Sequence, residues 1–307
     1  MTEQLPLFEN LQAEPADRAD DGPDAELDSD AGSLDELFRV TPAWRTGPGY
    51  AALLDGIARF PSFSPLNGFL IHLQDPDATR VATARTWARR LRRGVKPGAR
   101  PTTILARAAP VMFVFDIRDT EGPPLPPEAP PPPAVADRRL ARAADALLHN
   151  CRIQNIALRD ADPAQAAPER ALRVGPSVRK AHPGLERAAR YLVLVEAASG
   201  PEERYAALVQ ELAHIFCGHL GIDSDAWWAE REDLDLERAE VEAASVAFLV
   251  CRRRGLTRVA GRFTAGYASD ERRIPALSLN AVLQAATHIE AMSRSIWSRP
   301  LRRGRYQ

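Results

Sequence analysis

The first part of the chain alternates short amphipathic helices with runs that favour β-strands. Helical patterns are expected over three segments, residues 50–60, 66–74 and 83–93. Ser64 and Pro65 supply an N-cap and a first-turn proline for the second of these helices. β-Branched and aromatic runs at residues 102–105 and 111–117 predict two antiparallel strands. Together these elements predict a small α+β domain over residues 39–122.

A proline-rich stretch separates these elements from a second set. Eight of the residues from Pro123 to Pro133 are proline, so residues 123–134 are expected to form a semi-rigid linker. The pattern beyond it predicts a helix at 138–149, strands at 152–158, 171–174 and 190–195, and helices at 200–218, 239–251 and 277–296. We therefore expect a second domain over residues 135–296 and an α+β fold class.

The charges are distributed unevenly, although the formal net charge is −1. Up to Phe38 there are twelve acidic residues and one basic residue, so residues 1–38 are predicted to be a disordered acidic tail. From Val40 to Ala108 there are eleven basic residues and three acidic ones, and residues 297–307 form a basic tail. This asymmetry favours binding of a polyanion, although a solvated basic face would give the same composition.

Several protein classes are excluded by composition. The three cysteines lie far apart in the sequence, so no disulfide framework is indicated. The acidic N-terminus has neither the positive region nor the apolar region of a secretory signal. No apolar run is long enough to span a bilayer. We expect a cytoplasmic protein with no membrane partner.

Residues 210–214, with the sequence Gln-Glu-Leu-Ala-His, carry the strongest candidate chemistry. They almost match H-E-x-x-H, in which two histidines one turn apart hold zinc and the glutamate activates a bound water. Glu211 and His214 take the positions of the base and the second ligand, but Gln210 stands in the first ligand position. An amide oxygen is a weak ligand for zinc, so zinc binding should be weak or absent.

A third ligand should come from the next predicted helix. That helix is almost wholly apolar and must be buried, so a carboxylate at its start, Glu242 or Glu240, needs a metal, an arginine or a hydrogen-bond partner. Cys217 falls on the same helical stripe as the motif, whereas His219 follows the expected helix end and should point elsewhere. Either residue remains a candidate substitute ligand.

The motif helix expected at 200–218 is followed by a helix that begins with the stretch Glu240-Val241-Glu242-Ala243. The helix pair resembles the ImmA/IrrE type of zinc metallopeptidase, and the resemblance covers about residues 135–265. It implies a zincin-like domain with Glu211 as the catalytic base and with His214, Glu242 and Gln210 at the metal positions. Three interpretations stay open: a degenerate site on a folded platform, a zinc site completed by a substitute ligand, and residues that only fill the core and cap helices.

The strongest basic cluster spans residues 85–96, where five arginines and one lysine surround Trp87. Such a pattern suits contacts to a phosphate backbone, with a base stacked on the aromatic ring. The alternative is an amphipathic helix with a solvated arginine face and Trp87 in the core. Composition alone leaves both interpretations open.

Further motifs run in order through residues 44–122. They are Ser64-x-x-Asn67, Leu70-Ile71-x-x-Gln74-x-Pro76-x-Ala78-Thr79, Trp87, Gly94-x-Lys96-Pro97-Gly98 and Phe115-Asp116-x-x-x-Thr120-Glu121-Gly122. Together they resemble the N-terminal single-stranded-DNA-binding domain of ArdC-type antirestriction proteins, a family carried by plasmids, phages and other mobile elements. The resemblance implies single-stranded DNA binding. The expected DNA-binding residues are Asn67, Trp87, Arg89, Arg90, Arg92, Arg93 and Lys96, of which the arginines and the lysine are inferred from charge.

The sequence therefore predicts a single-stranded-DNA-binding protein of antirestriction type and mobile-element origin, with a degenerate zincin-like domain. The alternative is a zinc-dependent metallopeptidase that cleaves a DNA-bound regulator. The expected partners are single-stranded DNA and, for the alternative, a protein substrate.

Overall fold

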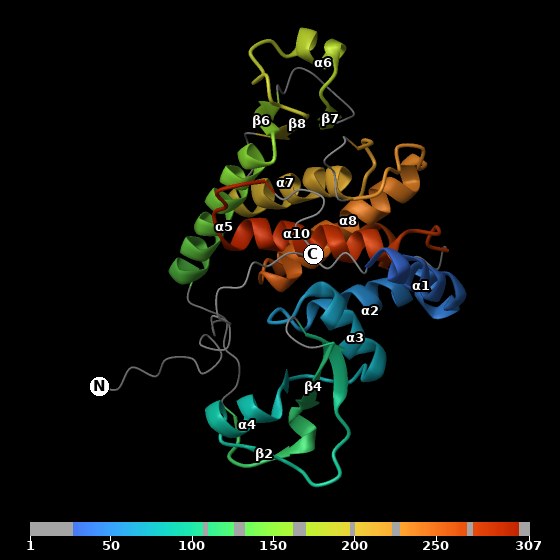
Figure 1. The fold of residues 1–307 in the computed structure, drawn as a ribbon, viewed down its shortest axis with the longest axis vertical. Helices are drawn as coiled ribbons and strands as arrows, with labels where there is room; N and C mark the ends of the chain where they lie inside the picture. The colour runs from blue at the N-terminus through green and yellow to red at the C-terminus, as the bar shows by residue number, and fades with distance from the viewer. Residues whose placement is uncertain are drawn as a thin grey trace. The chain divides into compact units, whose positions relative to one another are not determined.

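The computed structural model describes residues 27–106, 110–125, 133–161, 170–196, 200–222, 228–268 and 273–300. Most of the predicted proline-rich linker and basic tail, and the first 26 residues of the acidic tail, lie outside the described residues. The structure is mixed α+β with small sheets (Figure 1). None of the described helices is both long and apolar enough to cross a membrane.

The chain forms two compact units. Of the described residues, those from 55 to 125 form the first unit, and those from 27 to 54 and from 133 to 300 form the second. The structure thus divides the chain differently from the predicted domains, because residues 39–54 belong to the second unit rather than to the first.

The first unit is built on a three-stranded antiparallel sheet. The strand order is β1 (Val81–Ala82), β4 (Val111–Asp116) and β3 (Thr102–Leu105), and helix α3 (Pro65–Gln74) packs on one face. A two-stranded sheet pairs β2 (Gly94–Val95) with β5 (Thr120–Glu121), and α4 (Ala84–Arg90) precedes β2. The predicted strands at 102–105 and 111–117 pair antiparallel, as expected.

Helix α3 begins where its capping signals predict. The side chain of Ser64 accepts a hydrogen bond from the backbone N–H of Asn67, and Pro65 occupies the first helical position. The helix ends at Asp75, the residue before Pro76, which is disfavoured in the helical region.

The second unit packs helices beside a small mixed sheet. Its strand order is β6 (Ile156–Ala161), β8 (Tyr191–Glu196) and β7 (Ala171–Arg173), with β6 parallel and β7 antiparallel to β8. Its described α-helices are α1 (Leu27–Val40), most of α2 (Gly47–Ala58), α5 (Pro133–Ile153), α6 (Pro176–Ala181), α7 (Pro201–Phe216), α8 (Leu236–Arg253), α9 (Thr257–Ala268) and α10 (Leu279–Arg294). Figure 1 shows α7, α8 and α10 lying together, with the sheet near one end of α7.

Residues 27–40 form helix α1 (Leu27–Val40) instead of the predicted disorder. The reason lies at the C-terminal end of the helix, where Phe38 is fully buried and packs edge-on against Tyr50 at 5.6 Å between ring centroids. The backbone N–H of Asn280 also donates to Asp35. Composition gave the wrong prediction here because it does not reveal that Phe38 packs against Tyr50.

Candidate functional site

Helix α7 carries the Gln210–His214 motif and ends as predicted at a glycine. Gly218 has a φ of 82°, which favours glycine, and a Cβ on it would lie 2.0 Å from the carbonyl oxygen of Ala229. The backbone N–H of Arg231 donates to the Gly218 carbonyl at 3.0 Å. This close approach holds the segment around Arg231 against the end of α7.

The carboxylate of Glu242, on α8, is fully buried and is satisfied by protein groups. Arg231 forms a bidentate ion pair with it, with Nη2 donating to Oε1 at 2.7 Å. The backbone N–H of Ser278 also donates to Oε1 at 2.7 Å, and His219 Nε2 lies 3.0 Å from Oε2. Burial alone would raise the pKa of Glu242, but the hydrogen bonds from Arg231 and His219 hold it below its usual value.

These contacts continue through His219 to the motif histidine. His219 Nδ1 lies 3.1 Å from His214 Nδ1. Because ionised Glu242 can only accept, His219 donates to it through Nε2. When the His219 ring is neutral, its Nδ1 is an acceptor. His214 must then donate through its own Nδ1, which leaves a lone pair on its Nε2. Arg231, Glu242, His219 and His214 form one hydrogen-bonded chain, the His214 network.

The exposed end of the His214 network faces Glu240. His214 Nε2 lies 3.7 Å from Glu240 Oε1, and the Glu240 side chain is about half exposed. Burial, and then the neighbouring His219, lower the pKa of His214 to about 4, so this ring is neutral at pH 7. The atom available on His214 is therefore an unprotonated imidazole nitrogen, which is the form that binds metals.

Two glutamates at the start of α8, Glu240 and Glu242, lie on different sides of His214. Residues two apart on a helix point to nearly opposite sides, so Glu240 and Glu242 cannot both face His214 Nε2. Glu240 takes that position, whereas Glu242 reaches His214 through its Nδ1 side, by way of His219. The carboxylate nearest to the available nitrogen of His214 is thus Glu240.

Glu211 lies beside this face on α7. Burial raises the pKa of Glu211 to about 7, with Arg170 lowering it and Glu240 raising it further. Gln210 is partly buried on the same helix, one turn before His214. The α7–α8 face therefore gathers a neutral imidazole, an amide and two carboxyl groups, one of which titrates near neutrality.

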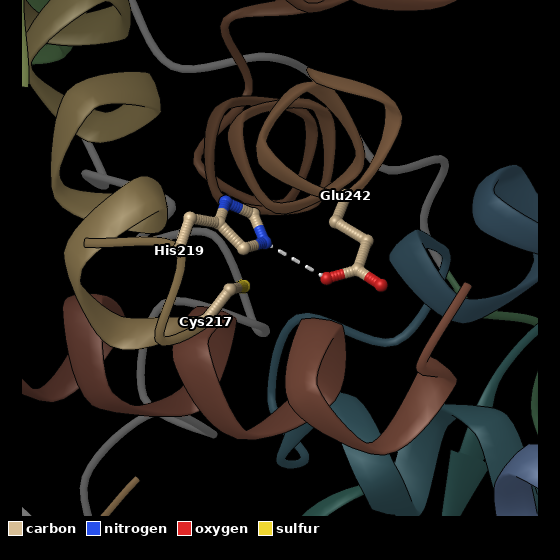
Figure 2. A group of neighbouring side chains, drawn as sticks. All are labelled: Cys217, His219 and Glu242. Carbon is tan, nitrogen blue, oxygen red and sulfur yellow. Dashed lines mark hydrogen bonds and ion pairs between the residues drawn. The ribbon is translucent and has the colours of Figure 1, made fainter. Parts of the chain in front are cut away.

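A second group of metal-type ligands lies on the other side of His214. Figure 2 shows Cys217, His219 and Glu242 pointing toward one another, and one ligand atom from each lies within 4.8 Å of the other two. Among the described residues, only this trio of His, Cys, Asp or Glu side chains meets that criterion. Without an ion, Arg231 supplies the positive charge beside Glu242, and burial raises the pKa of the Cys217 thiol well above its usual value.

Trp87, a predicted DNA-stacking residue, belongs to the core of the first unit. Its side chain is only 1% exposed, and its Nε1 donates to the carbonyl of Phe115 at 2.9 Å. A ring enclosed in this way cannot stack on a base. The alternative given by the sequence, with Trp87 in the core behind a solvated arginine face, is the arrangement that forms.

Three further predicted DNA contacts are engaged in holding the backbone. The Asn67 amide exchanges two hydrogen bonds with the backbone of Leu105. Arg93 donates to the hydroxyl and carbonyl of Thr120 and to the carbonyls of residues 122 and 123. Lys96 donates to the Arg118 carbonyl at 2.7 Å. These side chains are occupied in organising loops and a strand edge.

The exposed cations of the basic cluster are fewer than the sequence predicts. Arg89 and Arg92 are exposed, and Arg90 is partly buried. Arg92 has a φ of 53°, as the residue that follows the C-cap of α4. Two exposed arginines that were not assigned to DNA, Arg85 and Arg100, lie on either side of the cluster.

Sequence reasoning missed Arg231, and it named His219 only as a substitute ligand, without its contacts to Glu242 and His214. Arg231 lies in a charged stretch that is typical of a solvent-exposed segment, and His219 lies beyond the helix that carries the motif. One signal was available: a buried glutamate on an apolar helix requires a cation or donors, and arginine was among the named options.

Comparison with known proteins gives little guidance. No protein-family model matches the chain, and no curated protein matches it. Among solved structures, the chain is similar to the crystal structure of the antirestriction protein ArdC from plasmid R388 in its Mn(II)-bound form. The TM-score is 0.37 at 15% sequence identity, covering 87% of this chain and 94% of that chain. Similarity at this level assigns neither a family nor a function.

Proposed function

We propose that the second unit contains a weak divalent-metal site, in which His214 Nε2 and Glu240 hold the ion. The bound ion could support hydrolysis of a substrate. Gln210 adds its amide oxygen, and Glu211 is the neighbouring proton acceptor. The observation that carries this proposal is the His214 network, which orients the ring and leaves its Nε2 available on the side of Glu240. Histidines that bind metals typically donate their other N–H to an acceptor that fixes the tautomer.

The donor set explains why the affinity should be low. An imidazole and a carboxylate are good ligands for Zn²⁺ or Mn²⁺, but an amide is a poor substitute for a second histidine. When bound, such an ion would polarise a substrate carbonyl and lower the pKa of a bound water. The protein would contribute the orientation of His214 and a carboxyl group, Glu211, that can accept a proton near pH 7.

Metal titration of the full-length protein tests this proposal. We expect calorimetry with Zn²⁺ or Mn²⁺ to detect one weak site per chain. Gln210→His should tighten it by at least about 10-fold, since a lost supporting group alone costs 10–100-fold. Glu240→Gln should weaken it by a similar factor. Glu237→Gln, which removes an exposed carboxylate from the same helix, is the matched control and should bind like the unmodified protein.

Two results would overturn the metal proposal. One is binding that survives Glu240→Gln unchanged, and the other is a Gln210→His variant that binds no metal at all. If metal binds, an assay for cleavage of unstructured peptides distinguishes a metallopeptidase from a site that only binds metal. For a metallopeptidase, Glu211→Gln should abolish cleavage and keep metal binding.

A second function, single-stranded DNA binding of antirestriction type, is proposed for the first unit. It is supported by exposed arginines on and around α4, among them Arg85, Arg89, Arg92 and Arg100. If binding is electrostatic, the logarithm of affinity should fall linearly with the logarithm of salt concentration, with a slope of about −0.7 per phosphate contacted. Fluorescence anisotropy with a labelled oligothymidine strand measures this slope. Affinity that does not change with salt would contradict it.

A further inference from the structure

The three-stranded sheet of the first unit has one covered face and one open face. On the covered face Ile104 and Val114 are fully buried against α3 and its surroundings. Side chains alternate along each strand, so the neighbouring positions point to the opposite face. The register places Phe113 opposite Thr103, Val111 opposite Leu105, and Phe115 opposite Ala82.

The open face is apolar and carries an exposed aromatic ring. Phe113 is 54% exposed, and Leu105 and Val111 are each 43% exposed. An isolated exposed aliphatic side chain needs no explanation, but an exposed phenylalanine beside a pair of exposed aliphatic residues on one sheet face indicates a binding surface. We call the side chains of Leu105, Val111 and Phe113 the Phe113 face.

The β3 edge of the sheet is closed to an additional strand. The Asn67 and Gln74 side-chain amides, two turns apart on α3, each pair with both the N–H and the C=O of one residue of β3. Asn67 pairs with Leu105, and Gln74 pairs with Thr103. The outward-facing backbone groups that an incoming peptide strand would need are therefore already used. At β3, a partner can therefore bind to the face but not to the edge.

The charges around the Phe113 face favour a polyanionic partner. The described part of this unit, residues 55–106 and 110–125, contains ten basic and six acidic residues. Exposed Arg100 lies two residues before β3, and exposed Arg85 lies three residues after β1. The register brings the start of β3 and the end of β1 beside Val114 and Phe115. Only a few residues therefore separate Arg85 and Arg100 from the end of β4 that carries Phe113 and Phe115.

We propose that Phe113 is a stacking platform for a base of single-stranded DNA, with Leu105 and Val111 as its apolar rim and the exposed arginines contacting the adjoining phosphates. Stacking on exposed aromatic side chains within a positively charged surface is the general chemistry of single-strand binding. This inference rests on the proposed DNA binding and transfers the stacking role from the buried Trp87 to Phe113.

Substitutions at Phe113 in the full-length protein test this assignment with the same oligothymidine strand. Phe113→Ala should weaken binding by about 5- to 100-fold, the usual effect of losing one stacked base. Phe113→Leu should weaken it similarly, because it keeps apolar area but removes the ring. Phe113→Trp should keep the affinity, and the added tryptophan fluorescence should be quenched on binding. Leu73→Ala, which removes another exposed apolar side chain of the same unit, is the control and should have no effect.

The outcomes separate the stacking role from DNA binding itself. Salt-dependent binding that is equal in Phe113→Ala and the unmodified protein would overturn the stacking role and leave the DNA proposal intact. An unmodified protein that binds no single strand would overturn both. A Phe113→Ala variant that changes only self-association, measured by sedimentation, would show that the face binds a second copy of the chain instead.

Discussion

Replacing Arg231 with methionine should lower the free energy of unfolding by about 3–5 kcal/mol, the usual cost of leaving a buried charge without its partner. Glu242 is fully buried, and both of its oxygens accept from the Arg231 guanidinium. Without Arg231, the pKa of Glu242 should rise, because burial would then act with only His219 and a backbone N–H opposing it. Urea unfolding measures the change, and the destabilisation should shrink as the pH is lowered.

A second substitution separates the loss of the ion pair from the loss of packing. In Arg231→Met/Glu242→Leu both charges are absent, so most of the stability should return. Arg258→Met is the matched control: Arg258 also contacts two carboxylates, but on the surface, and its removal should change stability much less. If Arg231→Met is as harmless as Arg258→Met, Glu242 is not held by this ion pair.

The same ion pair shows how far the sequence could predict the site. An apolar helix with glutamates at its start is visible in sequence, and so is the requirement that a buried carboxylate be compensated. Which glutamate faces His214 is not visible. The choice between Glu240 and Glu242 depends on the rotation of α8 about its axis, and this rotation is set by packing against α7 and α10.

The basic segment illustrates a different limit. Local pattern correctly predicted a helix containing Trp87, flanked by exposed arginines. Whether the ring faces solvent or core depends on Phe115, which is 28 residues away in the chain. The Phe113 face was hidden for a related reason: β4 has apolar residues on both faces, so no alternation in its sequence marks one face as open.

His288 should make the protein acid-sensitive well above the pH at which carboxylates titrate. It lies on α10 and is almost completely buried, with its ring 4.5 Å from that of Phe216 and 5.4 Å from that of Trp297. Burial lowers the pKa of His288 to about 3, from the value of 6.5 expected in the unfolded chain. The unfolded state therefore binds a proton below pH 6.5 that the folded state does not.

Because the pKa of His288 is lowered in the folded protein, stability should fall as the pH falls. The stability associated with neutral His288 is complete above pH 6.5 and is lost as the pH falls toward 3, at about 1.4 kcal/mol per pH unit. Between pH 6 and pH 5, the free energy of unfolding of His288→Phe should therefore fall by about 1.4 kcal/mol less than that of the unmodified protein. Urea unfolding at each pH measures the difference. Met292→Leu, a non-titrating change in the same buried helix face, should shift the curve without altering its slope. Parallel curves for His288→Phe and the unmodified protein would mean that the folded protein protonates His288 as readily as the unfolded chain does, despite its packing against Phe216 and Trp297.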